Sequence, residues 1–225
     1  MKTAALALAL LAAGFAQQPA ASLAAVLQSL DAAAPGIHAV AAHAELEDYT
    51  ALVHDSSRST GMMYFERSGH SAMYALDLTQ PKDAAMRVVL RDQALWRYVP
   101  AAKEVTKYPL GAKQGLVDQF LLLGMGASGE ALTQSFAVSV AGTETLDGAP
   151  TVKLTLLPRA ASVAAQYPKI ELWYDTRTWV AAEEQLWQPG GDYHRVHFTQ
   201  VKLNPKLDRA VFSTTFPGAA VVISQ

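Results

Sequence analysis

Hydrophobic and polar residues alternate with a period of two over much of the chain, which is typical of half-buried β-strands. Turn residues separate the alternating runs, among them Ser68-Gly69 and Asp147-Gly148. Because most gaps are too short for a crossover helix, we expect neighbouring strands to pair in antiparallel fashion. The predicted strands are residues 61–67, 73–78, 86–90, 95–99, 136–140, 152–156, 170–174, 180–187, 193–201 and 209–213.

Two segments have helical spacing instead. Apolar residues between Leu23 and Leu30 recur on one helical face, Ser22 is suited to cap that helix, and Pro35 ends it. Residues 113–123 form a second apolar segment, also predicted to be helical. The chain contains no internal repeat and no linker, so the strands and helices are expected to form a single domain.

Residues 1–16 have the pattern of a cleaved secretory signal. A positive charge precedes an apolar run of about ten residues, and small residues stand at −3 and −1 of a cleavage site after Ala16. A run of about ten residues is too short to span a bilayer, which needs about 20. We therefore expect export, a mature domain of residues 17–225, and a periplasmic location.

Composition narrows the class of protein further. The chain has 225 residues, a net charge of −2 and no cysteine. A near-neutral charge without a basic cluster disfavours nucleic-acid binding. The lack of cysteine excludes disulfides, thiolate metal sites, iron–sulfur clusters and a cysteine-linked lipid anchor, so the mature protein is expected to be soluble. Alanine in the first segment contributes to the 51% hydrophobic content, which therefore overstates the core.

Two motifs suggest cofactor or metal sites, but neither has the required context. Residues 124–129 match G-x-G-x-x-G. A dinucleotide site needs a preceding parallel strand, whereas here a helix is predicted before the motif, so we expect a flexible glycine loop. His194 and His197 are three residues apart in a predicted strand and therefore face opposite sides. We accordingly expect no cofactor and no metal.

Candidate catalytic carboxylates also lack the necessary geometry. Glu183 and Glu184 are neighbours in a predicted strand, so they point apart and cannot act as an acid–base pair. Glu45 and Glu47 share a face but have no evident partner, and a solvated face is expected. The serines form no G-x-S-x-G motif. The sequence therefore favours a binding protein over an enzyme, with no catalytic residue.

Several short motifs occur in a recognisable order. Residues 61–67 read GMMYFER, residues 78–81 read LTQP and residues 95–100 read LWRYVP; Asn204-Pro205 and FPGAAVVI at 216–223 follow near the C-terminus. In this order and spacing the chain resembles the LolA-like outer-membrane lipoprotein carriers and lipoprotein-sorting proteins. The apolar segment before Gly124 falls where that family has small lid helices.

The resemblance implies an α+β fold that is mainly antiparallel β: a strongly curved, unclosed half-barrel with helices over its concave face. It also implies a soluble, monomeric periplasmic carrier that binds the acyl chains of lipoproteins in an apolar cleft. The implied partners are acylated lipoproteins, an inner-membrane ABC transporter and an outer-membrane acceptor, with only transient membrane contact. The expected cleft residues are Met63, Phe65, Tyr74, Leu76, Leu78, Met86, Val88, Leu90, Trp96, Leu116, Phe120 and Leu123.

Arg67 matches an arginine that, in the family, holds the covering helices closed through hydrogen bonds to loop backbone. Its parity agrees, because Arg67 shares a strand face with Met63 and Phe65. We therefore expect Arg67 to latch a lid. The sequence departs from the family pattern at Ser68, where proline is usual, and at Arg97, where the motif has an apolar residue.

Two other functions remain open on the same fold. One is a carrier of another lipid or hydrophobic ligand. The other is a sensor of envelope stress, for which a partner helix or second domain is expected. Flexible methionines suit an adaptable cleft but equally suit an ordinary core.

Overall fold

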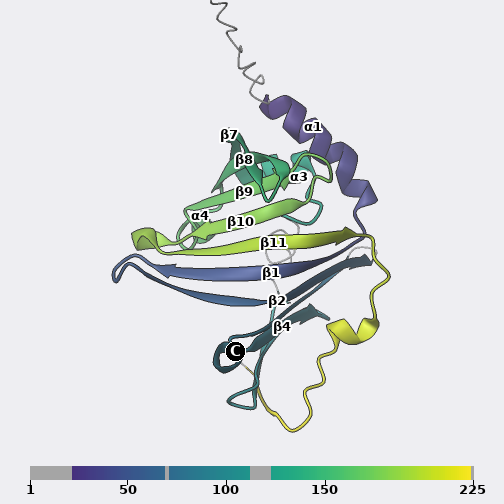
Figure 1. The fold of residues 1–225 in the computed structure, drawn as a ribbon, viewed down its shortest axis with the longest axis vertical. Coiled ribbons are helices and arrows are strands. Elements are labelled where there is room, and N and C mark those ends of the chain that lie inside the picture. The colour runs from purple at the N-terminus through teal and green to yellow at the C-terminus, as the bar shows by residue number, and fades with distance from the viewer. Residues whose placement is uncertain (1–21, 69–70, 112–122, 224–225) are drawn as a thin grey trace, which may run out of the picture.

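The computed structural model describes residues 22–68, 71–111 and 123–223 (Figure 1). The strands are β1 Ala39–Thr50, β2 Asp55–Ser68, β3 Ser71–Gln80, β4 Met86–Arg91, β5 Ala94–Val99, β6 Glu104–Pro109, β7 Phe136–Leu146, β8 Ala149–Pro158, β9 Lys169–Asp175, β10 Ala181–Trp187, β11 Tyr193–Leu203 and β12 Ala220–Ile223. The helices are α1 Leu23–Ala33, α3 Gly129–Ser135 and α4 Ala161–Ala164, with 3-10 turns η1 Ala34–Gly36, η2 Lys82–Ala84, η4 Pro189–Gly191 and η5 Arg209–Phe212.

The twelve strands among the described residues belong to one sheet, in the order β12-β6-β5-β4-β3-β2-β1-β11-β10-β9-β8-β7. Neighbours pair antiparallel, except that β12 lies parallel to β6. Within the described residues β12 and β7 stand at opposite edges, so the sheet is curved and unclosed (Figure 1). The structure confirms the predicted fold class, a mainly antiparallel open barrel with helices on one face.

The N-terminal helix begins where the sequence predicts. The Ser22 side chain accepts a hydrogen bond from the Ala25 amide, and η1, which contains Pro35, follows the helix. α1 buries Val26 and Leu30, and it packs beside α3. We call the sheet face under these helices the inner face and the opposite face the outer face.

Sequence reasoning missed β1, β6, β12, α3 and α4, and it misassigned the segment at 209–213. β1 was not predicted because alanines weaken its alternation, yet it lies between β2 and β11. α3 was not predicted either, although Ser128 caps it by accepting a hydrogen bond from the Ala131 amide. The strand predicted at 209–213 is wrong: Asp208 caps a 3-10 turn there, and that turn buries Phe212 against the outer face.

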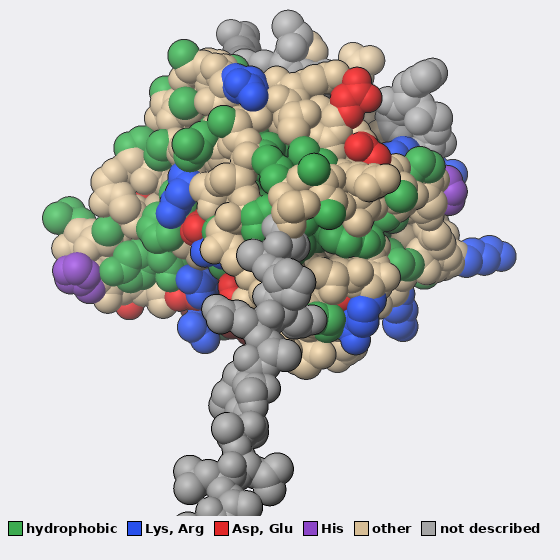
Figure 2. Space-filling view, turned by 90° about the horizontal axis from the view of Figure 1, so that it is seen from above, with side chains coloured by type: hydrophobic (Ala, Val, Ile, Leu, Met, Phe, Trp, Pro, Cys, Tyr) green, Lys and Arg blue, Asp and Glu red, His purple; other side chains and the backbone are tan. Residues whose placement is uncertain are grey.

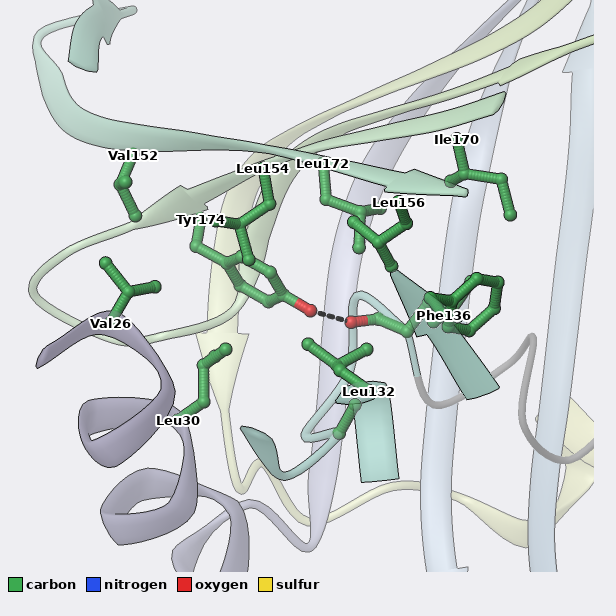
Figure 3. Close-up of a cluster of buried hydrophobic side chains, with 12 residues drawn as sticks. Val26, Leu30, Leu132, Phe136, Val152, Leu154, Leu156, Ile170, Leu172 and Tyr174 are labelled. Atoms are coloured by element: carbon green, nitrogen blue, oxygen red, sulfur yellow. Dashed lines mark hydrogen bonds between the residues drawn. The ribbon is translucent and has the colours of Figure 1, made fainter. Parts of the chain in front are cut away.

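Two hydrophobic clusters share the inner face. The helix-covered cluster joins α1 and α3 to β7–β9 (Figure 3): Val26, Leu30, Leu123, Ala127, Leu132, Phe136, Val152, Leu154, Leu156, Ile170, Leu172 and Tyr174. The second, centred on β1–β3, contains Ile37, Val40, Ala42, Ala44, Met63, Phe65, Leu76, Leu78, Met125, Val180 and Phe198. We call it the loop-covered cluster, because the chain that packs on it includes the loop around Met125.

The surface near the helices mixes apolar and charged side chains. Seen from above, hydrophobic side chains are spread over much of the face, with lysines and arginines lying among them and along the lower and right-hand margins (Figure 2). Among the described residues, none of the helices has the length and apolar character needed to cross a membrane.

Candidate functional site

Three apolar rows run across β2, β3 and β4 on the inner face. Strand register places Met63 opposite Leu76 and Leu76 opposite Val88, which makes one row. The other two rows are Phe65, Tyr74 and Leu90, and Gly61, Leu78 and Met86. The structure therefore brings together the eight cleft residues that the sequence predicted on these strands. The alternation of side chains along each strand was enough to predict the face on which these residues lie, because the strands contain no bulge between these positions.

Trp96 requires a correction, because it lies on the outer face. It pairs with Val89, packs with the cluster around Phe212, and carries Lys107 Nζ 4.7 Å from its ring centroid. Its neighbour Leu95 faces inward opposite Leu90. The prediction is wrong because it followed the motif rather than the parity of the strand.

The remaining predicted cleft residues lie near or within the segment before Gly124. Leu123 belongs to the helix-covered cluster and is 3% exposed. Leu116 and Phe120 lie outside the described residues, as does most of the predicted helix at 113–123.

The inner face is covered in part by residues 123–128, which we call the covering loop. Three strands hold its backbone carbonyls. The Tyr174 hydroxyl donates to the Leu123 carbonyl, which Figure 3 draws as a dashed line, and the Ala181 amide donates to the Gly124 carbonyl at 2.9 Å. Arg67 Nη2 donates to the Gly126 carbonyl, also at 2.9 Å.

The side chains of the covering loop reach both clusters. Met125 is 2% exposed and belongs to the loop-covered cluster, whereas Leu123 and Ala127 belong to the helix-covered one. The loop thus fills the junction between the two. Its backbone is fixed by polar contacts, and Met125 is the side chain it places against the rows of β2–β4.

Glycine is required in this loop for close packing. A Cβ atom at Gly124 would lie 1.8 Å from Glu184 Oε1, and Gly126 has a φ of +98°. The G-x-G-x-x-G motif therefore marks a loop seated on the sheet. The motif's last residue, Gly129, begins α3, so a helix follows the motif where sequence reasoning expected a strand.

Glu184 lies on the inner face beneath the covering loop, beside Gly124. Burial raises the pKa of this carboxyl to about 7. Burial, and secondarily the Glu184 charge, raises the pKa of Tyr74 and Tyr174 well above the usual tyrosine value. Sequence parity correctly separated Glu183 from Glu184, but it gave no sign that Glu184 is half-buried beside the covering loop.

The outer face carries an ion-pair network over β1, β2, β10 and β11. Glu45 and Glu47 have a partner after all: Arg58 lies 3.5 Å from the Glu45 carboxylate and 3.7 Å from that of Glu47. Arg195 reaches Glu47 at 3.7 Å. The prediction of unpartnered acids is wrong because Arg58 lies on β2, which pairs with the unpredicted strand β1.

The two histidines of β11 have separate sets of partners. His194 pairs with Asp48. His197 lies between Glu183 at 3.2 Å and Asp147 at 2.6 Å, and hydrogen bonds to these carboxylates raise its pKa to about 9. In the described part of the chain, no three metal-ligating side chains come together.

Known proteins resemble the chain in structure rather than in sequence. No family model matches it, and no curated protein does. An uncharacterized conserved protein from Thermus thermophilus superposes with a TM-score of 0.56 at 11% identity, covering 88% of this chain and 97% of that one. MucB superposes with a TM-score of 0.53 at 18% identity, covering 86% of this chain and 62% of MucB.

A LolA superfamily protein from Nitrosomonas europaea superposes more loosely, with a TM-score of 0.40 at 13% identity over 86% of this chain and 98% of that one. The two closer superpositions show a shared fold. The chain therefore has the curved, open, antiparallel fold with helices on one face that its resemblance to the LolA-like carriers implies.

Proposed function

We propose that this protein carries a lipophilic ligand, whose acyl chain it holds against the inner-face rows of β2–β4. The observation that carries this proposal is the way those rows are covered. Apolar side chains from three strands pack with Met125 of a loop whose backbone is held by hydrogen bonds from β2, β9 and β10. The part of the cover that moves in this proposal is Met125, while Leu123 and Ala127 stay in the helix-covered cluster.

The energetics favour exchange of the loop for a chain. Each hydrogen bond to the loop contributes on the order of 1 kcal/mol net. Each methylene group buried in its place contributes about 0.8 kcal/mol, so a fatty chain of about fifteen carbons contributes roughly 12 kcal/mol. In this mechanism Met125 leaves the cluster and the chain takes its place. Met63 and Met86 adjust because thioether side chains repack easily.

The finer proposal is that the cargo is the acylated N-terminus of lipoproteins, received from an inner-membrane ABC transporter and delivered to an outer-membrane acceptor. The order of motifs between residues 61 and 100 and the signal-like residues 1–16 support it. Under this proposal the protein acts in the periplasm, touches membranes transiently, and catalyses no reaction.

Material that co-purifies with the protein tests the proposal directly. The full chain would be expressed in its own host, purified under gentle conditions and analysed by mass spectrometry after both peptide and lipid extraction. Acylated peptides support lipoprotein cargo, and other lipids support a carrier with different cargo. If neither is found, and a fluorescent fatty acid also fails to bind, the carrier proposal is wrong.

The latch proposed for Arg67 has its own test. Arg67→Leu removes the hydrogen bond to the Gly126 carbonyl, so the closed state loses stability and acyl-chain affinity should rise about tenfold while release slows. Stopped-flow displacement of a fluorescent fatty acid measures both. Arg58→Leu, on the outer face of the same strand, is the matched control. Equal kinetics in the two variants would contradict the latch.

A second candidate function is recognition of a protein partner. MucB shares this fold and has been crystallised in complex with MucA. The chain spans 62% of MucB. If a periplasmic protein co-purifies in a defined ratio while the inner face holds no lipid, the sensor function replaces the carrier function.

A further inference from the structure

A cavity lies where β1 begins and β2 ends, beside the apolar rows. Its volume is about 370 Å³, and it is lined by the residues around Ala39, the end of β2 and the segment after β11. Asn204 fixes that segment: its side-chain oxygen accepts hydrogen bonds from the amides of His38 at 2.8 Å and Ala39 at 3.1 Å. Its side-chain amide donates to the Gly36 carbonyl at 2.8 Å. The wall of the cavity is therefore ordered by specific contacts.

The cavity is basic in a protein whose net charge is −2. Arg67, Lys206 and Arg209 line it, with Glu66 as the acidic residue in the lining. Glu66 is 3.3 Å from Arg209, so these two charges offset each other. Lys206 is exposed and has no ion-pair partner among the residues that the structure describes. The lining thus holds two positive charges in excess.

Arg67 connects this cavity to the covering loop. It lines the cavity, and its Nη2 donates to the Gly126 carbonyl on the inner side of the sheet. A ligand whose apolar chain lies on the rows of β2–β4 can therefore place a polar head beside Arg67. Guanidinium and ammonium groups on two different segments suit an oxyanion, since both donate charge-assisted hydrogen bonds.

We propose that this cavity binds a phosphate group, and that in the lipid-bound protein the phosphate belongs to the head of the ligand whose chain lies on the inner face. The proposal rests on the proposed carrier function for the chain, but it adds the head-group chemistry. Arg67 and Lys206 are the recognising residues. A phosphate that draws Arg67 toward the cavity also weakens its bond to Gly126, so head-group binding favours release of the covering loop.

Two lipids that differ only in the phosphate test this. A monoacyl glycerol phosphate and the monoacylglycerol with the same chain would be compared by displacement of a fluorescent fatty acid from the full-length protein, below their critical micelle concentrations. We expect the phosphate form to bind about tenfold more tightly at low salt, and this preference to shrink at high salt because exposed charges are screened.

The variants separate the cavity from general charge effects. Lys206→Glu should abolish the preference and leave the affinity for monoacylglycerol unchanged. Lys202→Glu makes the same charge change on an exposed residue of β11 outside the cavity lining, and should keep the preference. Equal preference in Lys206→Glu and the unmodified protein would overturn the proposal.

Inorganic phosphate distinguishes the source of the anion. If millimolar phosphate competes with the phosphate lipid but not with monoacylglycerol, the cavity recognises the lipid head. If phosphate alone binds and the two lipids bind equally, the cavity is a site for the free anion and the head-group proposal is wrong. If neither lipid binds at all, the carrier function itself fails.

Discussion

The two halves of the inner face are covered in different ways. Over β7–β9, α1 and α3 insert side chains such as Leu30 and Leu132 between aliphatic residues of the strands (Figure 3). Over β1–β3, the described cover includes a loop that contributes Met125 and is bound through its carbonyls. The first half is held by interdigitated side chains and the second by polar contacts to backbone. We infer that the first is a permanent core and that the second can open.

The amino-acid composition of the two clusters also fits a permanent core in one half and a removable cover in the other. The helix-covered cluster consists mostly of leucine, valine and isoleucine, whose preferred rotamers fix one packing. The loop-covered cluster includes Met63 and Met125, and on β1 it includes Ala42, which pairs with Met63, and Ala44, which pairs with Gly61. Methionine repacks readily and alanine leaves room for a new occupant. With this composition, the helix-covered half can keep the shape of the sheet while a ligand replaces the covering loop on the other half.

The largest expected effect separates the halves by stability. Leu132→Ala, at a residue 1% exposed in the helix-covered cluster, should lower the free energy of unfolding by about 3 kcal/mol, because it leaves a cavity that the surrounding core fills only partially. Met125→Ala should lower it by about 1 kcal/mol, since the loss is limited to the free energy of opening the loop. Urea denaturation measures both changes.

Hydrogen exchange supplies the second measurement for this pair. In Met125→Ala the amides of the covering loop should exchange faster while those of β8 and β9 keep their protection. Equal losses of unfolding free energy in the two variants, or uniform acceleration of exchange across the sheet, would remove the distinction between a permanent and a removable cover.

The next effect concerns Glu184, which lies where the covering loop meets β10. Burial raises its pKa from 4.5 to about 7, so the folded state holds the proton more tightly than the unfolded chain. Stability therefore falls as pH rises from about 4.5 to about 7, and the penalty is complete above that range. Glu184→Gln stays neutral and should be about 2 kcal/mol more stable than the unmodified protein at pH 8, with no gain at pH 4.

Urea denaturation at pH 4, 6 and 8 checks this prediction. Glu104→Gln, at an exposed position of β6, is the control and should show no such pH-dependent gain. The same data sharpen the comparison of the two halves. If the charged carboxyl opens the covering loop locally, exchange of the loop amides in the unmodified protein should quicken between pH 5 and pH 7, and that change should be absent in Glu184→Gln.

Sequence reasoning succeeded where strand parity alone decides position. It placed Met63, Phe65 and Arg67 on one face and separated Glu183 from Glu184, because alternation is a local property. It failed at β1, whose alanines hide the alternation, and so missed the partners of Glu45 and Glu47. The partners of these two residues depend on which strands lie side by side. The alternation within one strand does not show which strand is its neighbour.

The candidate site was predictable in part for the same reason. The rows of β2–β4 follow from local alternation. The covering loop does not, because its position depends on bonds from Arg67, Tyr174 and Ala181, which come from distant parts of the chain. The basic cavity likewise requires residues near 38, 67 and 206 to meet. Long-range contacts of this kind are visible only once the sheet order is known.

The smallest expected effect concerns the outer face, and it tests whether the ion pairs there are independent of the covering loop on the inner face. His197 joins the turn between β7 and β8, through Asp147, to Glu183 on β10, and hydrogen bonds to these carboxylates raise its pKa to about 9. The stabilisation is complete below the unfolded value of about 6.5 and is lost as pH rises through 9. This window lies above that of Glu184, so the two contributions can be measured separately.

His197→Gln should therefore reduce the free energy of unfolding by about 1 kcal/mol at pH 6, a modest value because the side chain is partly exposed, and the difference should vanish near pH 10. Acyl-chain binding and exchange of the covering loop should not change, since His197 lies on the opposite side of the sheet from the rows of β2–β4. A change in either would show that the β7–β8 turn and the covering loop move together, and the helix-covered half would then be part of the opening mechanism rather than its fixed support.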